Sequence, residues 1–86
     1  MTDPDHDPHR RYSRCLGQIV RARREAKGWS QVKFAALSGL SRAGVSKIEN
    51  GLTSPSAESQ WLIARALSMW PADLALDAER LMNCAA

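Results

Sequence analysis

Side chains of four chemical kinds are expected on one face of the segment 41–50. Val45 and Ile48 recur there at a three-residue spacing, which places both on one side of a helix. The opposite side would carry a guanidinium, a methyl, a hydroxyl and an ammonium group, on Arg42, Ala43, Ser46 and Lys47. Such a face can read base edges, since arginine binds guanine in bidentate fashion and a methyl group contacts the thymine methyl. An ordinary surface helix could carry the same residues, so the flanking segments must decide.

A second helix must hold a reading helix in place, and the preceding residues supply one. Ser30 is a suitable N-cap for a helix that runs through Ser38. Gly39 fits the tight turn that follows, because glycine tolerates a positive φ. Ser41 caps the next helix, which should end at Asn50-Gly51. Residues 30–51 therefore predict a helix-turn-helix unit.

Three more helices complete the expected domain. The first runs from Ser13 and stops at Gly28. The segment 53–56 is a loop before a fourth helix, whose Trp61 we assign to the core together with Trp29. Pro71 suits the first turn of a fifth helix. The sequence predicts an all-α fold of five short helices without strands.

Positive charge is concentrated in the middle of the 86 residues. From Arg10 to Pro55, ten Lys and Arg residues stand against two Glu residues, a net charge of +8, whereas both ends of the chain are acidic. This distribution favours a polyanionic partner, although a solvated helix face would look similar. Cys15 and Cys84 lie far apart without a CxxC spacing, which predicts ordinary thiols.

The ends of the chain are expected to lie outside the domain. Residues 1–12 lack a periodic apolar pattern, which predicts a flexible arm. We expect residues 13–78 to form the DNA-binding domain and residues 79–86 to form a C-terminal tail. The Asp and His side chains of the arm could hold a metal ion, but solvation is the simpler interpretation. The basic residues at the end of the arm, Arg10 and Arg11, could instead reach DNA together with Arg14.

Several classes of protein are disfavoured. The chain has no apolar run of about 18 residues and no apolar signal segment, so we expect a cytoplasmic, nucleoid-associated protein without membrane contact. It also shows no nucleophile–base pair, phosphate-binding loop or metal-ligand cluster. We therefore expect that the protein is not an enzyme and that it has no cofactor and no metal site.

The sequence resembles the lambda-repressor/Cro-like helix-turn-helix family of XRE-type regulators. The residues that carry the resemblance are Gly28-Trp-Ser-Gln31, Phe34-Ala35, Gly39-Leu-Ser41, Val45, Ile48-Glu-Asn-Gly51, Pro55-Ser56 and Ala64-Arg-Ala-Leu67. It covers about residues 16–76 and implies a compact five-helix lambda-repressor-like DNA-binding domain, with the helix-turn-helix formed by helices 2 and 3. The implied activity is sequence-specific binding of double-stranded DNA by a transcriptional regulator.

The resemblance also implies roles for matching residues. Gln31 and Asn50 would bind backbone phosphates on the two sides of the groove. Base edges would be read by Arg42, Ala43, Ser46 and Lys47. Arg24 and Glu49 match a structural salt bridge between the first and third helices, the alternative being two exposed charges that never meet. The loop after Gly51 lacks the basic residue of many relatives, so Lys33, Arg10 and Arg11 are expected to bind phosphate instead.

Three functions remain open. The first is a repressor that binds a palindromic operator as a homodimer, its half-sites about 34 Å apart. The segment from Trp70 would form the dimer contact, with candidate partner residues Trp70, Leu76, Leu81 and Met82. The second is an antitoxin-like component that binds a toxin and autoregulates its operon. The third is a protein-interaction module that retains the fold, and it alone predicts no salt-sensitive binding to duplex DNA.

Overall fold

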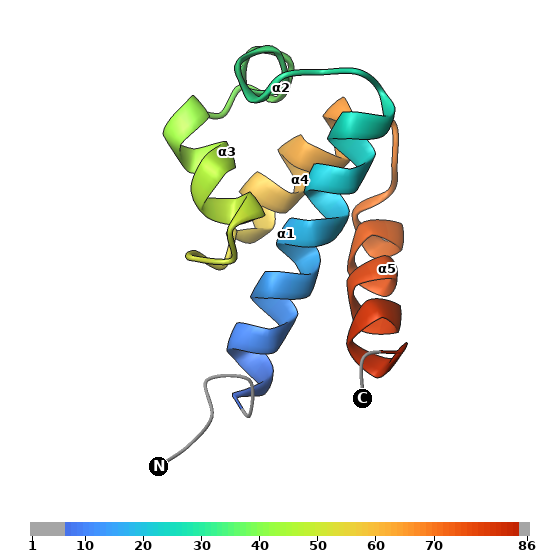
Figure 1. Cartoon of the computed structure of the whole chain (residues 1–86). Helices are drawn as coiled ribbons and strands as arrows, with labels where there is room; N and C mark the ends of the chain where they lie inside the picture. The colour runs from blue at the N-terminus through green and yellow to red at the C-terminus, as the bar shows by residue number, and fades with distance from the viewer. Residues whose placement is uncertain (1–6, 85–86) are drawn as a thin grey trace.

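Residues 7–84, the part of the chain that the computed structural model describes, form five α-helices and no strand. In chain order they are α1 (Pro8–Ala26), α2 (Gln31–Ser38), α3 (Arg42–Glu49), α4 (Ala57–Ala66) and α5 (Pro71–Cys84). Helix α1 runs along the molecule with α3 on one side and α5 on the other, and it packs against both (Figure 1). The predicted five-helix, all-α fold is confirmed.

Serine side chains begin α2, α3 and α4. The Ser30 hydroxyl accepts a hydrogen bond from the Lys33 backbone N–H at 3.1 Å, and the Ser41 hydroxyl accepts one from Gly44 at 2.9 Å. The Ser56 hydroxyl caps α4 in the same way. Between α2 and α3, Gly39 takes a φ of 83°, in the left-handed region that favours glycine. These local contacts bring α3 against α2 across a short turn.

Helix α1 begins at Pro8, earlier than the predicted start at Ser13. The Asp7 carboxylate accepts a hydrogen bond from the His9 backbone N–H at 3.0 Å, and Pro8 occupies the first turn. The prediction of a flexible arm was therefore wrong for residues 8–12. These residues are helical because the Asp7 cap and Pro8 favour the start of a helix even without an apolar pattern. The rest of that prediction, residues 1–6, lies outside the described residues.

The C-terminal end needs a similar correction. Helix α5 continues to Cys84, so residues 79–84 of the predicted tail are helical, and residues 85–86 lie outside the described part. Leu74 and Ala78 are fully buried, and both belong to the core. Leu81 and Met82 continue this face and pack against the core, which explains why the helix extends through the segment that we assigned to a tail.

The core lies where all five helices meet. Its largest fully buried side chains are Phe34, Leu16, Ile63, Leu74, Val20 and Val45. Trp29 is half-buried, and its ring stacks on Phe34 with 6.2 Å between the centroids. Trp61 is 49% exposed, which corrects its assignment to the core. Other residues of α4 fill the face of this helix that points to the core. The Trp61 ring lies outside the core, and the Arg65 guanidinium lies over it, 5.3 Å from the ring centroid.

Within the described residues, none of the helices combines the length and the apolar character that a membrane crossing requires.

Candidate DNA-binding surface

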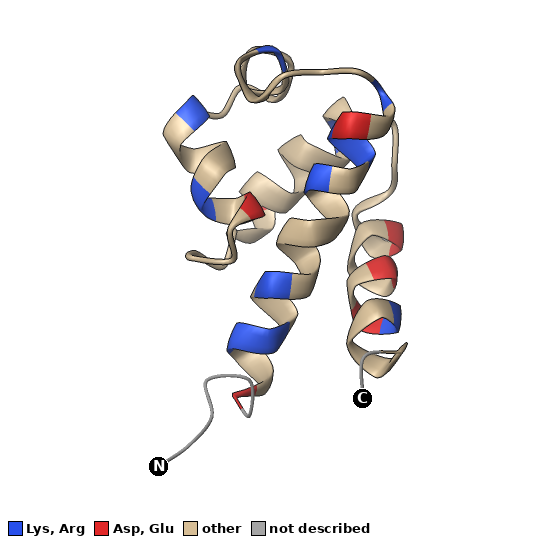
Figure 2. Ribbon diagram, viewed as in Figure 1, with Lys and Arg blue, Asp and Glu red and all other residues tan. Residues whose placement is uncertain are grey.

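Helix α3 turns its apolar side chains inward and its polar ones outward. Val45 and Ile48 are buried, whereas Arg42, Ala43 and Lys47 are exposed. Ser46 lies beside them and is partly exposed. Lys and Arg residues lie along α1 and α3, whereas α5 carries three of the seven Asp and Glu residues in the described part of the chain (Figure 2). The exposed side of α3 therefore belongs to the basic side of the molecule.

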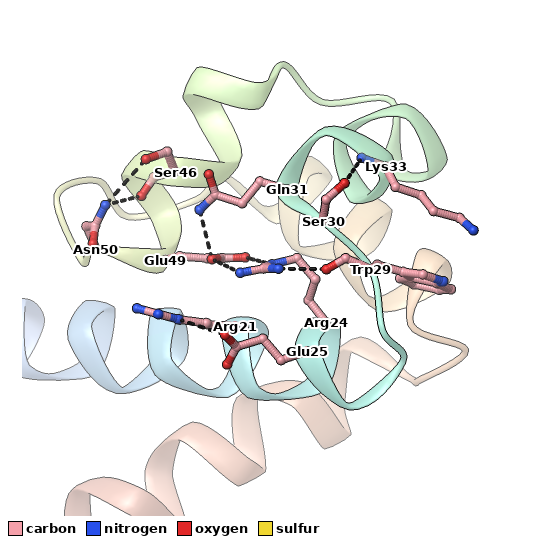
Figure 3. Close-up of polar contacts among 10 residues, drawn as sticks. All are labelled: Arg21, Arg24, Glu25, Trp29, Ser30, Gln31, Lys33, Ser46, Glu49 and Asn50. Carbon is pink, nitrogen blue, oxygen red and sulfur yellow. Dashed lines mark hydrogen bonds and ion pairs between the residues drawn. The ribbon is translucent and has the colours of Figure 1, made fainter.

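A buried ion pair joins α1 to the end of α3. Arg24 Nε donates to Glu49 Oε2 at 2.7 Å, and Arg24 Nη2 donates to Glu49 Oε1 at 3.0 Å (Figure 3). The side chains are only 10% and 2% exposed. The hydrogen bond to Glu49 raises the pKa of Arg24 above its ordinary value, although burial acts in the opposite direction. A bidentate pair of this kind fixes α3 relative to α1.

The same ion pair orients two neighbouring segments. Arg24 Nη1 donates to the Trp29 backbone carbonyl at 2.7 Å, which holds the connection between α1 and α2. Gln31 Nε2 donates to Glu49 Oε1 at 3.0 Å (Figure 3). We expected Gln31 only as a phosphate ligand, separate from the salt bridge. The structure instead places Gln31 and the bridge in one hydrogen-bonded network.

The other expected phosphate ligands lie around α2, α3 and α1. Asn50 Nδ2 donates to the Ser46 backbone carbonyl at 2.9 Å, so its side chain folds back on the last turn of α3. Lys33 is exposed in the first turn of α2, and Arg10 is exposed on α1. Arg11 differs from the expectation, because its Nη2 donates to the Met82 backbone carbonyl of α5. The longer α1 thus separates these two arginines onto different sides.

Two glycines allow α1 and α3 to approach each other. A Cβ on Gly17 would lie 2.2 Å from the Ile48 carbonyl oxygen and 2.8 Å from that of Glu49. Gly51 has a φ of +70°, and a Cβ there would lie 2.9 Å from the Cα of Arg14. Sequence reasoning missed Gly17. Its signal was a glycine inside a strong helical pattern, which often marks close backbone packing.

Comparisons with known proteins identify this arrangement. Residues 20–69, more than half of the chain, match the family model described as helix-turn-helix. The transcriptional regulator SlrR of Bacillus subtilis is 37% identical over 68 residues, which are 78% of this chain and 44% of SlrR. The chain spans less than half the length of the curated relatives that it matches.

Two solved structures are similar in fold. The restriction-modification controller protein C.AhdI of Aeromonas hydrophila has a TM-score of 0.69 at 39% identity, with 72% of this chain and 94% of that one covered. The clp gene regulator ClgR of Corynebacterium glutamicum has a TM-score of 0.80 at 27% identity, with 86% and 79% covered. The family and these relatives are regulators rather than enzymes. The chain belongs to the helix-turn-helix family of XRE-type, DNA-binding transcriptional regulators.

Proposed function

We propose that this chain represses transcription by binding a palindromic operator as a homodimer, with α3 in the major groove. The observation that carries the proposal is the exposed polar face of α3, held by a buried bidentate ion pair. A reading helix must keep a fixed orientation while its outer side chains contact bases. This arrangement meets both needs, and membership of the helix-turn-helix family supports it.

The base-reading residues in this proposal are Arg42, Ala43, Ser46 and Lys47. Gln31, Lys33 and Asn50 would bind phosphates. Gln31 begins α2, where the positive end of the helix attracts anions. Its amide group has two N–H donors, and Glu49 accepts a hydrogen bond from that group at 3.0 Å. The second donor can therefore serve a phosphate without breaking the network.

Two exposed apolar side chains support a dimer contact near α5. Trp70 is 76% exposed and Leu76 is 42% exposed. Leu81 and Met82, which we also expected in a partner surface, are partly buried against the core. We therefore centre the proposed contact on Trp70 and Leu76. Two-fold pairing would present two copies of α3 to half-sites about 34 Å apart.

Selection of bound sequences from a random duplex pool tests the reading face. Arg42→Ala and Lys47→Ala should each relax base preference at particular positions, by about 1–3 kcal/mol for a lost bidentate contact. Gln31→Ala should weaken binding to all sequences alike. Arg23→Ala is the charge-matched control, because Arg23 pairs with Asp77 of α5 instead. Unchanged preferences in both reading-face variants would contradict the proposal.

A reporter gene tests the direction of regulation. A promoter that overlaps the selected sequence should lose transcription when the wild-type chain is supplied, and Arg42→Ala should restore it. Increased transcription would contradict repression. A wild-type chain that shows no salt-sensitive binding to any duplex would instead favour the protein-interaction module.

A further inference from the structure

Gly44 lies in the first turn of α3, beside the residues that would read bases. Lys47 follows three residues later, so the two positions are neighbours on the helix surface. Gly44 is partly exposed, whereas Val45 and Ile48 of the same helix are buried. A glycine within a helix costs stability relative to alanine, because its backbone loses more conformational freedom on folding. The presence of a glycine here therefore needs a reason.

The fold supplies such a reason for the other four of the five glycines. Gly17 lies directly against backbone carbonyls of α3. The other three have a positive φ, and they are Gly28, Gly39 and Gly51. Gly44 has neither property, since its φ is not positive. Apart from its chain neighbours and the backbone of its own helix, a Cβ at Gly44 would have only the Ser41 hydroxyl oxygen within 4 Å, at 3.0 Å.

The serine cap of α3 does not require a glycine at this position either. In each of the three serine-capped helices, the hydroxyl accepts a hydrogen bond from the backbone N–H of the third residue after it. These third residues are Lys33 in α2, Gly44 in α3 and Ser59 in α4. The bonds in α2 and α4 are 3.1 Å long although their third residues carry side chains, and the bond in α3 is 2.9 Å long. A shift of the Ser41 hydroxyl by a few tenths of an ångström would therefore make room for a Cβ.

The surface at Gly44 is suited to an apolar contact. Its N–H already donates to Ser41, so the position offers a bare Cα and no free backbone donor. Among the groups that bases present in the major groove, the 5-methyl group of thymine is the apolar one. We propose that Gly44 determines sequence preference, because one thymine methyl in each half-site packs against its Cα, where a side chain would collide with it. This inference rests on the proposed function, since it takes α3 to lie in the major groove.

The test combines Gly44→Ala with duplexes that lack single methyl groups. Ser59→Ala is the matched control, because Ser59 holds the same position after the cap of α4, outside the proposed reading face. The probe is a fluorescent duplex carrying the sequence selected by the wild-type chain. In further probes, deoxyuridine, which lacks only the methyl group, replaces one thymine at the same place in both half-sites, and each thymine is replaced in turn. Anisotropy measures affinity, and urea unfolding followed by circular dichroism measures stability.

At one thymine, the two chains should prefer opposite duplexes. The wild-type chain should bind the deoxyuridine duplex about fourfold more weakly per half-site, because one buried methyl contact is lost. Gly44→Ala should bind the unchanged duplex about tenfold more weakly than the wild-type chain does, and it should bind the deoxyuridine duplex more tightly than the unchanged one. Ser59→Ala should keep the wild-type affinities. The urea midpoint of Gly44→Ala should equal or exceed that of the wild-type chain, since alanine favours a helix.

Four results would overturn the inference. A Gly44→Ala chain that is less stable than the wild-type chain, or unfolded, would show that the fold itself needs the glycine. Wild-type affinity of Gly44→Ala for the unchanged duplex would show that no base approaches this position. A Gly44→Ala chain that prefers deoxyuridine at none of the thymines would exclude the methyl contact, while the proposed function would stand. A wild-type chain that binds no duplex would overturn both the inference and the proposed function.

Discussion

Replacing Arg24 with methionine should sharply reduce the stability of the domain. The change removes three hydrogen bonds, two to Glu49 and one to the Trp29 carbonyl. It leaves the Glu49 carboxylate, 2% exposed, with the Gln31 amide as its remaining side-chain donor among the described residues. Breaking a buried ion pair by removing one partner costs about 3–5 kcal/mol. We expect a loss within this range.

Such a loss is a large part of the total stability. A chain of this length has a free energy of unfolding of roughly 4–13 kcal/mol. With an m-value of about 1 kcal/mol per molar urea, the midpoint should fall by about 3 M or more. Urea unfolding followed by circular dichroism measures this shift. The matched control is Arg23→Met, since the Arg23–Asp77 side chains are 48% and 24% exposed and such pairs contribute at most about 1 kcal/mol.

A double variant separates the charge effect from the loss of packing. Arg24→Met/Glu49→Leu should recover most of the stability, because apolar residues of similar volume can replace a buried ion pair. It should still bind duplex DNA more weakly than the wild-type chain, because Gln31 loses the acceptor that orients it. A cost below about 1 kcal/mol for Arg24→Met, or a double variant no more stable than Arg24→Met, would refute this reasoning.

Three other predictions follow from the packing. Gly17→Ala should destabilise the domain by about 3 kcal/mol in urea unfolding, because its Cβ would lie 2.2 Å from a backbone oxygen of α3; a change below 1 kcal/mol would contradict this close approach. Trp70→Ser/Leu76→Glu should convert a dimer to a folded monomer in sedimentation, and a persistent dimer would place the contact elsewhere. Burial, and then the charge of Glu79, raise the pKa of Tyr12 above 10.0. The folded state therefore keeps the phenol proton to a higher pH than the unfolded state, so the free energy of unfolding should fall as the pH rises past 10.0. This fall should be less steep in Tyr12→Phe. Equal slopes of the free energy of unfolding against pH in the two proteins would contradict the prediction.

Sequence reasoning succeeded where local chemistry decides the structure. The Ser30 and Ser41 caps, the left-handed Gly39 and the spacing of Val45 and Ile48 each act within a few residues. They are sufficient to predict the helix-turn-helix and the outward face of α3. The family resemblance adds Arg24 and Glu49, which meet in the structure although they lie 25 residues apart.

The remaining features depend on contacts between distant segments. The glycine at 17 is needed only because the carbonyls of α3 pass over it, and Gln31 joins the ion pair only once α2 and α3 are packed. The apolar periodicity of α4 does not show that smaller residues fill its inner face and leave Trp61 half-exposed. The start of α1 was missed because Asp7 and Pro8 signal a helix without an apolar pattern.

Dimethyl sulfate footprinting tests the central claim, insertion of α3 into the major groove, most directly. The reagent methylates guanine N7 in the major groove and adenine N3 in the minor groove. The wild-type chain should protect guanine N7 atoms in two half-sites about 34 Å apart, and Arg42→Ala should lose protection at one guanine in each. Reactive N7 atoms together with protected adenine N3 atoms would place the protein in the minor groove and contradict the account.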